Sequence, residues 1–123
     1  MALLVDVFDV VELIEDMPAH GLSSGMQGTI LDVYAEGQAF EVEFSDQDGT
    51  PLAILAVNRE QFLVVWRART RQWVSLADKT AELVSRMPTA VGVQVLDFAR
   101  FLTMRSSYPV MQESLHASSL SPS

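Results

Sequence analysis

The stretch Phe40-Glu41-Val42-Glu43-Phe44 decides how the first half of this sequence folds. Apolar and acidic side chains alternate strictly in it, and a period of two residues is typical of a strand with one buried face. Phe40, Val42 and Phe44 are therefore expected in the core, and Glu41 and Glu43 in water. A helix could not place the three apolar side chains on one face, so the pattern predicts an antiparallel strand.

Strand and turn signals surround this stretch on both sides. The pair Asp48-Gly49 is a favoured hairpin turn, and Pro18 and Gly21 interrupt the chain earlier. The remaining predicted strands cover residues 7–16, 28–34, 52–57 and 62–65, with a one-turn helix over residues 58–61. Five short strands joined by tight turns predict a mainly β fold, namely a five-stranded SH3-like barrel.

A helical pattern replaces the strand pattern after Trp66. Ser75 and Asp78 have the spacing of a capping box, and Pro88 separates two runs of apolar residues at helical spacing. These runs predict a helical hairpin as a C-terminal extension of the barrel. The predicted organisation is an acidic barrel over residues 1–66, a basic linker over 67–74, a two-helix element over 75–104 and a disordered tail over 105–123.

Charge is divided unevenly along the 123 residues, whose formal net charge is −8. Residues 1–64 hold 12 acids and one base, a charge of −11, and residues 65–123 hold 4 acids and 7 bases, a charge of +3. An acidic first half repels phosphate backbones and favours a basic partner. The acidic residues predicted to face this partner are Glu12, Asp16, Glu41, Glu43, Asp46 and Asp48.

The second predicted helix carries an apolar face at spacings of four, three and four residues. This face consists of Val91, Val95, Phe98 and Leu102, and one other short helix is too small to bury all four. The face is therefore predicted to bind a protein partner or a second copy of the chain in a homodimer.

Three alternating arginines, Arg67, Arg69 and Arg71, lie on the predicted linker. Arginines directly after an acidic domain can pair with the carboxylates of that domain, and they can also contact phosphate. The second interpretation would make the protein a nucleic-acid-binding or ribosome-associated barrel. Both alternatives follow from the same residues.

Catalytic and metal-binding constellations are not predicted. The segment Gly21-Leu22-Ser23-Ser24-Gly25 matches the pattern of a nucleophile elbow, but a proline turn precedes it and a strand follows it. The chain has no cysteine, and its two histidines, His20 and His116, lie on different segments. We therefore expect neither an enzyme nor a cofactor. The absence of a basic, apolar leader and of a long apolar span predicts a cytoplasmic protein.

A family resemblance rests on a series of short motifs in the first half. These motifs are residues 13–22 (LIEDMPAHGL), 25–30 (GMQGTI), Tyr34, 40–44 (FEVEF), 48–49 and 61–63 (QFL). Together they closely resemble the small bacterial family known as domain of unknown function 4926. The resemblance implies a stand-alone small domain that is often encoded beside toxin-like genes and acts as an antitoxin or immunity protein.

A second resemblance covers residues 80–104. The segments 83–88 (LVSRMP) and 95–102 (VLDFARFL) look like the helical segment of the domain of unknown function 2281 family and of related antitoxin tails. The expected function is thus a non-catalytic protein-binding module, the antitoxin-like partner of a bacterial toxin-like protein, which it occludes. The alternative is a nucleic-acid-binding or ribosome-associated barrel, similar to the KOW module, that uses the arginine linker.

Overall fold

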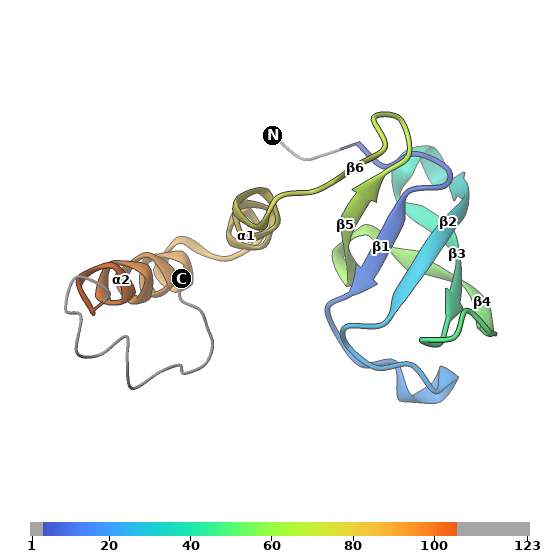
Figure 1. Cartoon of the computed structure of the whole chain (residues 1–123), viewed down its shortest axis with the longest axis horizontal. Coiled ribbons are helices and arrows are strands. Elements are labelled where there is room, and N and C mark those ends of the chain that lie inside the picture. The colour runs from blue at the N-terminus through green and yellow to red at the C-terminus, as the bar shows by residue number, and fades with distance from the viewer. Residues whose placement is uncertain (1–3, 106–123) are drawn as a thin grey trace. The chain divides into compact units, whose positions relative to one another are not determined.

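The structure is a computed structural model that describes residues 4–105 (Figure 1). Its strands are β1 (Val10–Leu13), β2 (Gln27–Tyr34), β3 (Ala39–Ser45), β4 (Pro51–Asn58), β5 (Phe62–Arg67) and β6 (Gln72–Trp73). Its helices are the 3-10 turns η1 (Pro18–His20), η2 (Ala35–Gly37) and η3 (Arg59–Gln61) and the α-helices α1 (Leu76–Ser85) and α2 (Thr89–Arg105). The described chain divides into two compact units. The first ends at Leu83 and the second begins at Val84.

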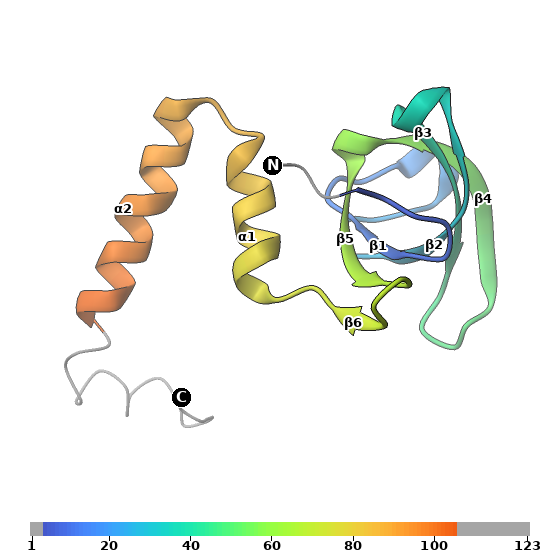
Figure 2. The same cartoon turned by 90° about the horizontal axis from the view of Figure 1, so that it is seen from above.

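The strands form one antiparallel sheet in the order β4-β3-β2-β1-β5-β6 (Figure 2). The prediction of a mainly β fold is confirmed, but the predicted closed barrel of five strands is not, because the sheet has six strands and is open. Among residues 4–105, β4 and β6 are the two edges. The sixth strand has a local cause. β6 pairs with the edge of β5 that faces away from β1.

One face of the sheet carries the core, as the alternation in β3 predicts. Phe40, Val42 and Phe44 are at most 2% exposed. The ring of Phe40 packs edge-on against the ring of Phe62 from β5, with 5.3 Å between centroids. The other buried members of this cluster are Val11, Leu13, Leu22, Ile30, Val57, Val64 and Val74. These side chains come from β1 to β5 and two connecting segments, so they hold the strands together around one apolar centre.

Gly28 marks the closest approach of β2 to β3. A Cβ atom at this position would lie 2.6 Å from Cγ1 of Val42 and 2.9 Å from the carbonyl oxygen of Glu43. Only glycine lets the two strands pair at this point without a shift of the backbone.

The N-terminal strand is shorter than predicted. Phe8 has a φ of +75° and the amide of Asp9 bonds to the carbonyl of Asp6, so a turn replaces an extended start over residues 7–9. The carboxylate of Asp9 closes this turn: Oδ2 accepts from the amide of Asp6 and Oδ1 from the amide of Ala68, each at 2.8 Å. Asp9 is 1% exposed, and it ties the start of the chain to the segment that follows β5.

The predicted basic linker is a β-hairpin rather than an extended connection. Arg67 ends β5, the amide of Arg71 bonds to the carbonyl of Arg67 at 2.8 Å, and Gln72 pairs with Arg67 as β6 begins. The two residues of β6 are too few to give a strand pattern in the sequence. In the structure, the hydrogen bonds of the Ala68 and Arg71 amides fix the turn between β5 and β6.

The two predicted C-terminal helices are confirmed. Ser75 caps α1, because its Oγ accepts a hydrogen bond from the amide of Asp78 at 3.0 Å. Within the first unit, Glu82 of α1 forms an ion pair of 3.5 Å with Arg59 of η3, and both side chains are less than a fifth exposed. Pro88 precedes α2, as expected for a residue that starts a helix.

Two predictions fall at the edge of the described chain. The predicted tail begins at Arg105, but Arg105 ends α2, and residues 106–123 lie outside the described residues together with His116. Between residues 4 and 105, no helix has the length and apolar character needed to cross a bilayer.

Candidate functional site

The outer side of β3 and β4, opposite the core, combines acidic and apolar side chains. Glu43 pairs in register with Ile54, and Glu41 pairs with Ala56, so these residues share one side of the sheet. Leu52 and Ile54 are 45% and 55% exposed. We name the surface made by Glu41, Glu43, Leu52, Ile54 and Ala56 the β3–β4 face. It lies on an edge strand of eight residues, the kind of strand that other chains can approach.

Glu41 is held in place on this face by a neighbour. The phenol of Tyr34 donates a hydrogen bond of 3.0 Å to Oε1 of Glu41. This bond, which ionisation of the phenol would break, raises the pKa of Tyr34, and partial desolvation and the negative charges of Glu41 and Asp32 raise it further. Tyr34 is 42% exposed, so the pair presents an oriented carboxylate and an aromatic ring together.

The other predicted acidic residues do not join the β3–β4 face in one site. Asp46 stabilises the turn between β3 and β4, since its Oδ1 accepts from the amides of Asp48 and Thr50 at 2.9 Å. Asp16 accepts from the amide of Ser24 at 2.8 Å, and Glu12 lies on β1 between Gln27 and Leu63 in the sheet register. Asp16 and Asp46 thus support loops, whereas Glu41 and Glu43 project from a strand.

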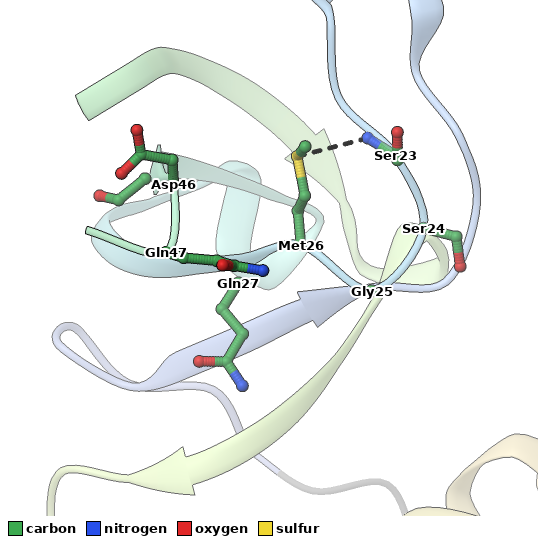
Figure 3. Close-up of a pocket in the computed structure, with 8 residues that line it drawn as sticks. Ser23, Ser24, Gly25, Met26, Gln27, Asp46 and Gln47 are labelled. Carbon is green, nitrogen blue, oxygen red and sulfur yellow. Dashed lines mark hydrogen bonds between the residues drawn. The ribbon is translucent and has the colours of Figure 1, made fainter. Parts of the chain in front are cut away.

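A hollow of about 550 Å³ lies between the loop before β2 and the loop after β3 (Figure 3). Its lining comprises Ser23, Ser24, Gly25, Met26, Gln27, Ser45, Asp46 and Gln47. The sulfur of Met26 accepts from the amide of Ser23 at 3.4 Å, which folds the loop onto itself. In the described hydrogen bonds, neither serine hydroxyl is joined to a basic side chain, so the segment that matches the nucleophile pattern forms a loop wall.

No group of three or more residues of the types that bind metals comes together among residues 4–105. The described part of the chain also contains one histidine, His20, which is exposed at the end of η1.

The motifs of the first half decide the family. Residues 7–64 match the model of the family described as Domain of unknown function (DUF4926). The matched segment is 58 of the 123 residues, and we refer to residues 7–64 as the DUF4926 domain. The match confirms the resemblance stated from the sequence, and it covers the core strands and the β3–β4 face but ends within β5. Neither a curated protein nor a solved structure matches the chain.

The arginines lie on the hairpin that follows the DUF4926 domain. Arg69 forms an ion pair of 3.0 Å with Asp6, and Nη1 of Arg67 lies 3.5 Å from the carbonyl oxygen of Leu4. Arg69 therefore pairs with a carboxylate of the same unit, whereas Arg67 contacts a backbone carbonyl. On the same hairpin Trp73 pairs in register with Trp66 and is 68% exposed.

The predicted face of α2 is exposed. Val91, Phe98 and Leu102 are 42%, 61% and 40% exposed, and Val95 is half-buried. The ring of Phe98 stacks on the ring of Phe101 with 6.3 Å between centroids. α2 therefore presents a continuous apolar surface.

Sequence reasoning missed Leu52 and Ile54, although a signal for them existed. Within the strand over residues 51–58, a period of two puts Leu52, Ile54 and Ala56 on one side and Ala53, Leu55 and Val57 on the other. Both sides are apolar, so the strand pattern alone could not say which side faces the core. The register with β3 decides it, because Val42 is buried and pairs with Leu55.

Proposed function

We propose that this protein is a non-catalytic binding module that acts as the antitoxin or immunity-like partner of a bacterial toxin-like protein. In this proposal the DUF4926 domain is an SH3-like domain of the bacterial cytoplasm that covers the working surface of a basic protein. The observation that carries the proposal is the β3–β4 face, where Glu43 stands beside the exposed Ile54 on an edge strand. Carboxylates next to apolar side chains fit a partner surface with the same mixture and opposite charge.

Charge gives the proposed mechanism its first step. The twelve acids of residues 1–64 create a field that attracts a basic partner and accelerates the encounter. Leu52 and Ile54 then lose water against the partner, and this burial stabilises the complex. The strand order β4-β3-β2-β1-β5 and the 3-10 turn before β5 support an SH3-like arrangement. In such an arrangement the outer sides of the short strands are available for binding.

The test begins with affinity capture of the tagged full-length protein from the bacterium that encodes it. Glu43→Lys reverses one charge on the β3–β4 face, and Asp97→Lys makes the same change in net charge on α2, as a matched control. A captured basic protein should bind Glu43→Lys about tenfold more slowly than the wild type at low salt, and the control at the wild-type rate. Equal rates for both variants and the wild type would refute a role for the β3–β4 face.

Occlusion is tested separately with the captured protein. Its expression alone should slow growth, and coexpression of the wild-type module should restore growth. Ile54→Asp, which places a third carboxylate in the contact, should restore growth poorly. A captured protein whose expression leaves growth unchanged argues against the toxin-neutralising role, even if it binds.

A second function is favoured by one observation, the exposed Trp73, which follows Arg71 by two residues on the hairpin after β5. An exposed aromatic ring next to guanidinium groups can stack a base while the cations contact phosphate. Fluorescently labelled single-stranded RNA and DNA would then bind at low salt, and Trp73→Ala would weaken this binding. Absence of binding at 20 mM salt, roughly the condition that most favours phosphate contacts, rules this function out.

A further inference from the structure

The α2 helix is apolar over most of its circumference, which is typical of a helix that is covered by other protein. Its exposed apolar side chains are Val91, Val93, Leu96, Phe98, Phe101, Leu102 and Met104. Only three described residues of the helix, Asp97, Arg100 and Arg105, carry charge. A surface helix of a monomer would carry polar side chains along its exposed side.

A second side of α2 borders a hollow of about 470 Å³, which is lined by Val84, Met87, Pro88, Thr89, Gly92, Val93 and Leu96. At 100° per residue, Val93 and Leu96 lie about 130–170° from the mean direction of Val91, Val95, Phe98 and Leu102. The latter four residues, which we name the α2 seam, therefore form a separate face, and none of them lines this hollow.

The spacing of the α2 seam is that of a helix that pairs with another helix. Intervals of four, three and four residues repeat every seven residues, so the seam stays on one side over about three turns. Ala99 lies on one flank of the seam, and its small size lets a second helix approach closely at that position.

We propose that the occupant of the α2 seam is the seam of a second copy of this chain, with the two helices antiparallel. In this register Val91 faces Leu102 of the other copy, and Val95 faces Phe98. The next position of the seam is Arg105, which a parallel pair would place against its own counterpart. The antiparallel pair separates the two Arg105 guanidinium groups by the length of the helix and opposes the helix dipoles favourably.

Charge favours α2 over the DUF4926 domain as the contact between copies. Residues 1–64 carry −11, so two such surfaces repel one another, whereas residues 84–105 carry one acid and three bases. The exposed fractions of the seam and Phe101 correspond to roughly 400–500 Å² of apolar surface per chain, or about 900 Å² for the pair. This area is at the low end of specific interfaces, so the dimer should be weak and should form only at high protein concentration. Such a dimer would leave both β3–β4 faces available and make the module bivalent, but the dimer does not depend on the proposed function.

The first experiment measures the mass of the full chain by sedimentation equilibrium at concentrations from about 5 to 300 μM. The wild type should shift from monomer to dimer. Phe98→Lys should remain a monomer throughout, and Met104→Lys, a matched change on the opposite side of α2, should dimerise like the wild type. Circular dichroism confirms that both variants keep their helices. A wild type that stays monomeric, or a Phe98→Lys variant that dimerises normally, overturns the proposal.

The second experiment determines the direction of the pair. Because the chain has no cysteine, Val91→Cys and Leu102→Cys each introduce a single thiol. In the antiparallel pair, two Cys substitutions at Val91 lie about 16 Å apart along the axis, beyond the reach of a disulfide. Each variant alone should therefore stay unlinked in a glutathione redox buffer, and an equimolar mixture should form the mixed disulfide. Disulfides within each variant alone, without the mixed product, would indicate a parallel pair and refute the antiparallel one.

Discussion

Replacement of Asp9 by alanine tests the anchor that holds the start of the chain against the hairpin after β5. The carboxylate is 1% exposed and accepts two amide hydrogen bonds of 2.8 Å, from Asp6 and Ala68. A hydrogen bond to a charged group contributes about 1.5–3 kcal/mol, and water can reach the two partly buried amides in the variant. The expected loss is therefore about 2–4 kcal/mol, a large share of the 5–15 kcal/mol typical of small domains.

Urea unfolding followed by tryptophan fluorescence measures this loss. At a slope of about 1–1.5 kcal/mol per molar urea, the midpoint of Asp9→Ala should fall by about 2 M. The midpoint of Asp9→Asn should fall less, because the side-chain amide of asparagine keeps one acceptor oxygen. Asp6→Asn is the control, since it removes only the exposed ion pair with Arg69 and should cost less than about 1 kcal/mol. If the free energy of unfolding of Asp9→Ala lies within about 0.5 kcal/mol of the wild-type value, the hydrogen bonds of Asp9 do not hold the start of the chain against the hairpin.

Three further predictions concern local features. Gly28→Ala should cost about 3 kcal/mol in urea unfolding, because the new methyl group would lie 2.9 Å from a carbonyl oxygen of β3; a neutral effect would contradict the close pairing of β2 and β3. Ser75→Ala should cost about 1 kcal/mol, because the amide of Asp78 loses its cap; unchanged thermal unfolding would show that α1 does not need it. Glu41→Gln should lower the pKa of Tyr34, because it removes the charged acceptor that raises it. Ultraviolet titration of the phenols should therefore shift to lower pH, and the variant should lose less stability than the wild type as the pH rises above the pKa of the unfolded phenol, because its folded and unfolded pKa values differ less; an unshifted titration would show that Glu41 does not raise the pKa of Tyr34.

The extent of sequence-based prediction differs between the elements. The alternation in β3 predicted both the strand and its buried face, because a period of two has a single interpretation when one side is acidic. The strand over residues 51–58 was predicted, but its outward Leu52 and Ile54 were not, because both of its sides are apolar. The hairpin between Arg67 and Trp73 was predicted as a linker, because its two-residue strand gives no pattern and one of the bonds that fold it comes from Asp9, 59 residues before Ala68.

The candidate site shows the same division. The sequence predicted Glu41 and Glu43 on the outer side of β3 and exposed to water, whereas the structure shows both half-buried there, in register with Ala56 and Ile54 of β4. Asp16 and Asp46 were grouped with these residues on charge alone, but their carboxylates accept amide hydrogen bonds in loops. Composition counts such carboxylates equally, and only their bonding partners separate them.

The sequence by itself determined the mainly β class, the order of β1 to β5 and of the two C-terminal helices, the family match of residues 7–64 and the apolar face of α2. Each of these follows from local patterns of two to seven residues, or from motifs in a fixed order. The tertiary structure decided that the sheet is open, that β6 forms one of its edges, and which apolar residues of β4 face outward. These features depend on which strands pair and in which register, and the composition of a single strand does not record the strand that it will meet.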